Sequence, residues 1–187
     1  FMFSDRIEGK WINLFADTLA RCGVSPGDEV VILSETQSRK LNVHLCELAL
    51  VQLGSRPLHV VLTTPPQTAS VPIRSTGASA SLQAMKPAMA ALEFGGLVID
   101  CTLEGLLHAP ELPAILKSGT RVMMVSNEHP EILERVGSDD QLKGRVKTGM
   151  KWMRGARHMH VTSNAGTDLK IDLEGSVVGG GWGYTTT

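Results

Sequence analysis

The 187-residue chain is predicted to fold as an α/β protein with a three-layer, mostly parallel, Rossmann-like sheet, helices on both faces and an antiparallel edge. Three observations predict this class. Continuous apolar, β-branched runs indicate strands that are buried on both faces. Segments with helical spacing lie between these runs, and such alternation is typical of parallel sheets. The last two strand-like runs are joined by a short turn, which predicts antiparallel pairing.

The first part of the chain predicts two helices and two strands. Apolar residues at i, i+3, i+4 and i+7 define one face of a helix that ends at Gly23. The run "EVVILSE" is apolar and β-branched, so it predicts a buried strand. A long Pro/Thr/Ser/Gly-rich interval, residues 65–79, predicts a functional or flexible loop. The elements in order are helix 10–22, strand 29–35, helix 38–54 and strand 56–64.

The second part continues the alternation and ends in a glycine-rich tail. Pro87 is expected to kink the third helix, because proline removes a backbone donor. We expect an α/β domain over residues 1–175 and a tail or hinge over residues 176–187. The expected elements are helix 81–95, strand 96–101, helix 110–119, strand 120–126, two helices within 129–156, strand 157–164 and strand 167–175.

Composition excludes several classes of protein. The chain is 42% hydrophobic and 20% charged with a net charge of −1, which suits a globular domain and gives no electrostatic case for nucleic acid or an anionic membrane. No apolar run approaches the roughly 20 residues of a membrane span, and the first residues do not resemble a secretory signal. The three cysteines lack C-x-x-C spacing, which favours reduced, buried thiols and a cytoplasmic location.

Common catalytic motifs are missing from the places where they would be needed. The turn after the first strand, "SETQSRK", has no glycine to admit a pyrophosphate, and neither a P-loop nor a G-x-S-x-G elbow occurs. His158 and His160 share one face of a predicted strand and could seat a metal, but a third ligand is not apparent. The simpler interpretation is a pair of partly exposed histidines, so we predict no metal ligands within these residues.

His108 is the strongest candidate for chemistry. It follows the strand 96–101 by a short loop, and open α/β sheets place their ligands beside the carboxyl ends of strands. We expect Leu106 and Leu107 to desolvate the imidazole and favour its neutral, basic form. Spacing alone leaves the alternative, a loop histidine without a role, equally open.

Two segments give the chain a family resemblance. The run "GLLHAPELPAILKSGTRVMMVSNEHPEILERV", followed by "RHMHVTSNAGTDLKIDLEG", resembles the N-terminal half of the 2,5-dihydroxypyridine 5,6-dioxygenases, over about residues 90–175. These are iron(II) ring-cleaving enzymes of bacterial nicotinate breakdown. A segment like "SNAGTDLKIDLEG" also recurs in aminopeptidase T-like metallopeptidases, which are expected to form the wider superfamily.

The resemblance implies roles for two residues. His108 would be the base that deprotonates a ring hydroxyl, and Leu107 would line the ring pocket. The substrates would be a small hydroxylated N-heteroaromatic compound and O2. Iron(II) would be held by a C-terminal domain that these residues do not contain, so the chain alone is expected to be inactive. The apolar surface left by such a domain favours self-association, and we expect a homo-oligomer.

Two other functions stay open at this point. Lys170 and Asp172 follow the pattern of the peptidase-like relatives, so a metal-dependent aminopeptidase is an alternative. The third possibility is a non-catalytic scaffold or assembly module, for which replacing His108 would leave turnover intact.

Overall fold

The computed structural model describes residues 6–66, 78–83, 85–136 and 141–183. The chain forms two compact units, residues 1–136 and residues 137–187. The sequence analysis expected a boundary after residue 175, between an α/β domain and a tail or hinge. That boundary stays a prediction. The predicted functional or flexible loop at 65–79 falls largely outside the described residues.

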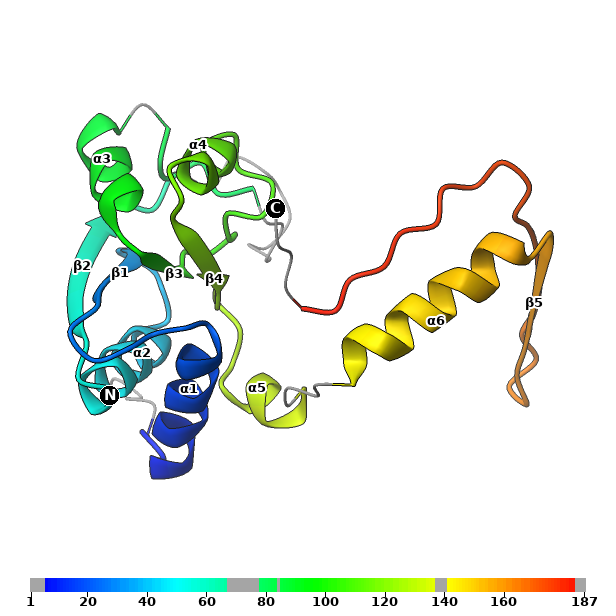
Figure 1. Ribbon diagram of the computed structural model, residues 1–187, viewed down its shortest axis with the longest axis horizontal. Coiled ribbons are helices and arrows are strands. Elements are labelled where there is room, and N and C mark those ends of the chain that lie inside the picture. The colour runs from blue at the N-terminus through cyan, green and yellow to red at the C-terminus, as the bar shows by residue number, and fades with distance from the viewer. Residues whose placement is uncertain (1–5, 67–77, 84, 137–140, 184–187) are drawn as a thin grey trace. The chain divides into compact units, whose positions relative to one another are not determined.

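The first unit is a four-stranded parallel sheet with helices on both faces (Figure 1). The strand order is β2-β1-β3-β4, and every pairing within this sheet is parallel. The predicted fold class is therefore confirmed. Its elements are α1 (Gly9–Arg21), β1 (Glu29–Glu35), α2 (Lys40–Gln52), β2 (Arg56–Leu62), α3 (Lys86–Phe94), β3 (Leu97–Cys101), α4 (Leu112–Lys117), β4 (Arg121–Met124) and α5 (Glu131–Arg135).

Alternate side chains of the central strands fill two separate cores. Val30 and Ile32 of β1 pack among residues of α1 and α2, such as Phe15 and Leu45. Val31 belongs to the opposite core, with residues of α3 and α4. Because successive side chains of a strand point to opposite faces, one continuous apolar run supplies both layers. Figure 1 shows α1 and α2 on one side of the sheet and α3 and α4 on the other.

The strand order places a topological switch point between β1 and β3. The chain runs from β1 outward to β2 and then crosses back past β1 to form β3. The loops that follow β1 and β3 therefore leave the sheet in opposite directions, which opens a crevice at their carboxyl ends.

Pro87 begins a helix instead of bending one. The predicted helix 81–95 is shorter in the structure, where α3 starts at Lys86 and Pro87 lies in its first turn. The missing N–H of proline has no partner to lose there, and its fixed φ suits a helix start. The predicted kink at this residue is wrong.

The second unit contains α6 (Leu142–Gly155), β5 (His158–Thr162) and β6 (Asp168–Asp172). The antiparallel pairing of β5 with β6 is confirmed, but the pair forms a two-stranded sheet of its own and not an edge of the parallel sheet. Ser163 N–H donates to Thr167 O at 3.1 Å, and this bond closes the turn of the hairpin.

The three cysteines are free thiols, as predicted. Cys46 of α2 and Cys101 of β3 are buried with their sulfur atoms 3.9 Å apart, and Cys22 is half-buried. No helix within the described ranges is long and apolar enough to cross a membrane.

Candidate functional site

Three loops meet at the carboxyl edge of the sheet, beside the switch point. Ser38 Oγ, in the loop after β1, donates to the carbonyl of Cys101 at 2.6 Å. Arg39 N–H donates to Asn127 Oδ1 at 3.1 Å, which joins the same loop to the one after β4. Ser126 N–H in turn donates to Asp100 O at 2.8 Å. These bonds hold the loops after β1, β3 and β4 together.

Buried polar side chains gather at this edge. Glu35 and Asp100, at the ends of β1 and β3, are 1% and 0% exposed. Glu35 Oε1 accepts a hydrogen bond of 2.9 Å from Ser79 Oγ. Polar groups are costly to bury without partners, so their concentration here marks the edge as a specialised part of the fold. The buried polar residues of this edge are Ser34, Glu35, Ser38, Ser79, Ser81, Asp100, Thr102 and Ser126.

The backbone at the end of β4 is unusual. Ser126 has a φ of 50°, a left-handed conformation that residues other than glycine rarely adopt. Its carbonyl accepts a hydrogen bond from Asn42 Nδ2 at 3.3 Å, and its N–H is used by Asp100 O. The surrounding bonds therefore maintain a conformation that costs free energy, as is common beside functional sites.

Leu107 and His108 are the two central residues of a tight turn. Ala109 N–H donates to Leu106 O at 3.0 Å, which closes the turn. Leu106 and Ala109, at its two ends, are buried in the core on the α3 and α4 face. The turn is therefore anchored at both ends, and its tip presents the two residues that the sequence singled out.

The tip of this turn is open to solvent. Leu107 is 56% exposed and His108 is exposed. The expected desolvation of His108 by Leu106 and Leu107 is wrong, because His108 is exposed and Leu106 is 0% exposed within the core. The imidazole of His108 makes no hydrogen bond to any residue that the structure describes. Both ring nitrogens are therefore available to a ligand.

The predicted pair of histidines, His158 and His160, lies on the β5–β6 hairpin. His160 Nε2 is 2.6 Å from Asp168 Oδ1, and His158 Nδ1 is 3.8 Å from Asp172 Oδ1. Within the described ranges, no three His, Cys, Asp or Glu side chains are grouped so that they could hold a metal ion. These residues therefore do not fit an iron(II) site.

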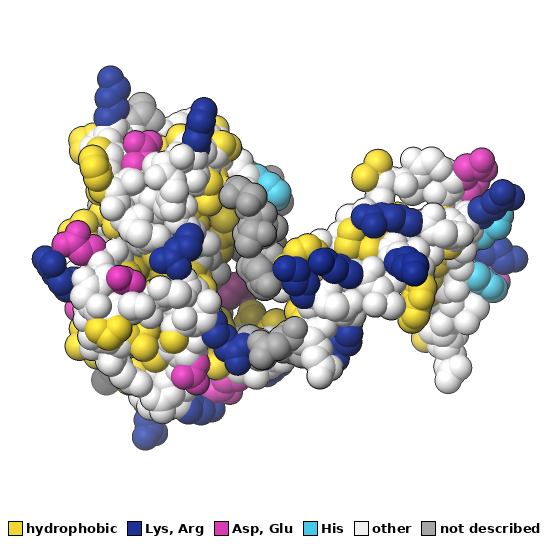
Figure 2. Space-filling model, in the orientation of Figure 1, with side chains coloured by type: hydrophobic (Ala, Val, Ile, Leu, Met, Phe, Trp, Pro, Cys, Tyr) yellow, Lys and Arg dark blue, Asp and Glu magenta, His cyan; other side chains and the backbone are white. Residues whose placement is uncertain are grey.

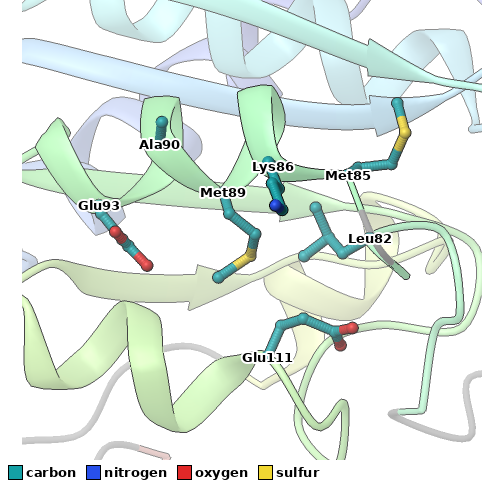
Figure 3. Close-up of a pocket in the computed structure, with 7 residues that line it drawn as sticks. All are labelled: Leu82, Met85, Lys86, Met89, Ala90, Glu93 and Glu111. Atoms are coloured by element: carbon teal, nitrogen blue, oxygen red, sulfur yellow. The ribbon is translucent and has the colours of Figure 1, made fainter.

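A separate shallow cavity of about 310 Å³ lies between α3 and the residue before α4 (Figure 3). Its apolar lining residues include Leu82 and Met89, and Glu111 contributes a carboxylate oxygen, Oε2, that has no hydrogen bond to a described residue. Leu107 and His108 do not line it. The cavity is therefore not the ring site that the sequence predicts, although it lies just beyond the same loop.

Comparison with known proteins identifies the family of the chain. A family model described as NicX, 2,5-dihydroxypyridine 5,6-dioxygenase, matches residues 10–187. The chain belongs to this family. The predicted resemblance is thereby confirmed, whereas placement in a superfamily with the aminopeptidase T-like enzymes stays a prediction.

A curated relative and a solved structure, both from Pseudomonas putida KT2440, give the extent of the similarity. The chain is 41% identical over 86 residues to a 2,5-dihydroxypyridine 5,6-dioxygenase, covering 46% of this chain and 24% of that protein. The solved structure of a 2,5-dihydroxypyridine dioxygenase superposes with a TM-score of 0.70 at 29% identity, covering 89% of this chain and 48% of that one. The NicX-like chain thus spans about half the length of its solved relative.

Proposed function

We propose that this chain is the N-terminal α/β part of an iron(II)-dependent dioxygenase that opens the ring of 2,5-dihydroxypyridine or a similar hydroxylated N-heteroaromatic compound. Family membership supports the reaction class. The observation that carries the assignment to residues is the anchored turn, which holds Leu107 and His108 side by side at the carboxyl edge of the sheet.

In this proposal His108 accepts the proton of a ring hydroxyl group. A neutral imidazole has one nitrogen that can accept a proton, and His108 has both nitrogens free of described partners. Leu107, beside it on the turn, offers an exposed apolar surface against which a flat ring can pack. Iron(II), which would supply the activation of O2, is expected in a part of the whole protein that this chain does not contain.

The test is turnover of 2,5-dihydroxypyridine by the full-length protein, loaded anaerobically with iron(II) and then given O2. The proposal expects loss of substrate absorbance with matching O2 uptake. Release of amino acids from short peptides under zinc or cobalt, without O2 uptake, would instead assign the protein to the peptidase alternative.

A pair of variants tests the two residues. His108→Ala should lower the rate by roughly 10²- to 10⁴-fold, the usual effect of losing a general base, with the iron content unchanged. Leu107→Ala should act mainly on KM, since it removes apolar contact with the ring and leaves the base in place. Loss of iron together with activity in His108→Ala would contradict the assigned role.

A further inference from the structure

The loop that carries His108 is wrapped around one buried carboxylate. Asp100, at the end of β3, is 0% exposed. Its Oδ1 accepts hydrogen bonds from Thr102 N–H at 2.9 Å and from Thr102 Oγ1 at 2.6 Å, and its Oδ2 accepts one from Leu106 N–H at 2.8 Å. All three donors belong to the loop that follows Asp100, so this side chain organises the loop.

The bond to Leu106 acts directly on the turn. Leu106 is the first residue of the turn, and its carbonyl accepts the closing bond from Ala109 N–H. The Leu106 N–H is held by Asp100 and its side chain is held by the core. Leu107 and His108 follow immediately, so their direction depends on how firmly Leu106 is fixed.

Two further bonds close the loop. Gly105 N–H donates to Thr102 Oγ1 at 3.1 Å, and Gly105 O accepts a bond of 2.8 Å from Ser79 N–H. Ser79 is itself bonded to Glu35 of β1. The loop is therefore fixed from β3 by Asp100 and from β1 through Ser79, across the switch point.

Burial of a carboxylate at this position costs free energy. Burial raises the pKa of the Asp100 carboxyl group; hydrogen bonds from Thr102 and Leu106 oppose that rise, and the charge of Glu35 adds to it. A neutral side chain would avoid the desolvation cost, but only a carboxylate offers acceptors to all three donors in this geometry. Hydrogen bonds to an ionised acceptor are also about twice as strong as neutral ones.

We propose that Asp100 is the positioning residue for His108: its carboxylate fixes Leu106 and thereby aims the imidazole at the ring hydroxyl. This inference rests on the proposed function. It assigns Asp100 no contact with the substrate and no proton transfer.

Asp100→Asn is the decisive variant because it preserves shape. An amide keeps one acceptor oxygen and turns the other position into a donor, so either Leu106 N–H or the Thr102 donors face an N–H group. Thr102→Val removes the hydroxyl that joins Asp100 to Gly105, and Thr102→Ser restores it. Ser55→Ala is the matched control, since it removes a buried hydrogen bond, of 2.9 Å to Leu50 O, at the opposite edge of the sheet.

The kinetic experiment is a double-mutant cycle in the full-length enzyme. Asp100→Asn should lower kcat per folded molecule by about 10- to 100-fold, the scale of a misplaced catalytic group, with a smaller change in KM. In a His108→Ala background the same substitution should have almost no further effect, because Asp100 acts through His108. Thr102→Val should behave like a weaker Asp100→Asn, and Thr102→Ser and Ser55→Ala like the unaltered enzyme. Equal losses of kcat in the two backgrounds would overturn the proposal.

Hydrogen exchange tests the positioning role of Asp100 independently of the proposed dioxygenase function. Asp100→Asn should speed exchange of the Leu106 and Ala109 amides at least about tenfold, the effect of losing a hydrogen bond to a charged group, and leave the amides of β1 unchanged. Ser55→Ala should not change the Leu106 and Ala109 amides. Unchanged exchange at these two amides would overturn the positioning of the turn. Faster exchange in a protein that never turns over a dihydroxypyridine would support the positioning and reject the proposed function.

Discussion

The two compact units of the chain differ in how far their side chains are buried. In residues 1–136 the strands β1 and β3 are sandwiched between two cores of buried side chains. In residues 137–187 none of the described side chains is fully buried. Figure 2 shows basic and hydrophobic side chains exposed over the second unit, where α6 carries Lys143, Arg145, Lys147, Lys151 and Arg154 and where Trp152 is 74% exposed.

This difference indicates which part of the chain can hold a functional side chain in a fixed position. A two-stranded hairpin is at best marginally stable in water without a core to cover it. The hairpin β5–β6 has local bonds and exposed ion pairs, whereas the turn of His108 is anchored in a core and on a buried carboxylate. Function that needs a rigid side chain is therefore expected in the first unit.

The largest expected contrast is in hydrogen exchange of the 187-residue chain. Amides of β1 and β3 open only with most of the first unit, so they should exchange at least about 10³-fold more slowly than those of β5 and β6. Exchange followed by mass spectrometry after digestion measures both regions in one sample. Equal protection of the hairpin and the parallel sheet would break the comparison.

Matched isoleucine substitutions come next. Ile99 of β3 is 0% exposed, and Ile171 of β6 is half-buried. Ile99→Ala should lower the free energy of unfolding of the first unit by about 2–5 kcal/mol, the cost of lost burial plus a cavity. Ile171→Ala should cost less than about 1 kcal/mol, because little buried contact is removed. Urea unfolding decides between these values, and similar losses for the two variants would contradict a core confined to the first unit.

A smaller effect concerns the pH dependence of the first unit. Because the pKa of Asp100 is raised on folding, the folded chain keeps this proton at pH values where the unfolded chain has released it. The stabilisation is fully present below the ordinary pKa of an aspartate and is lost as the pH rises through the raised one. The free energy of unfolding, relative to Asp100→Asn, should therefore fall as the pH rises from the ordinary aspartate pKa of 3.8 through the raised one. A rise over that interval would mean that the hydrogen bonds outweigh burial.

The smallest effect is expected at the ion pair of the hairpin. His160 and Asp168 are 52% and 69% exposed, and exposed pairs contribute about 0–1 kcal/mol. Asp168→Asn should change exchange of the β5 amides by less than about fivefold. A larger change would show that this pair, and not the turn, is the main support of the hairpin.

The layers of the fold were predictable because β1 and β3 are continuous apolar runs. The runs "EVVILSE" and "GLVIDC" can only be buried on both faces, and that requires helices above and below. The start of α3 was misread, although proline in the first turn of a helix is a known signal. The hairpin was predictable from the short turn between its two strand-like runs, but such a local signal does not say which sheet a hairpin joins.

The site was only partly predictable. The position of His108 after a strand predicted that it lies at the carboxyl edge of the sheet, where the structure has it, yet the burial of Glu35 and the bonds of Asp100 were missed. Asp100 followed by Thr102 is a short-range signal, because an Asp side chain commonly accepts the N–H of the residue two positions later. The hydrogen bond that Leu106 N–H donates to Asp100 leaves no such signal in the sequence, because it depends on the path of the loop in three dimensions.

The two buried sulfur atoms allow the opening rate of the first unit to be measured by thiol labelling. The hydrogen bond between Cys46 and Cys101, together with burial, raises the pKa of the Cys101 thiol well above its ordinary value. The reactive thiolate is therefore scarce, and a water-soluble alkylating reagent can reach either sulfur only when α2 separates from the sheet. Cys22, which is half-buried, should be labelled first, and the second unit contains no cysteine. The labelling rate of the two slow thiols thus counts opening events of the parallel sheet alone, without any probe added to the chain.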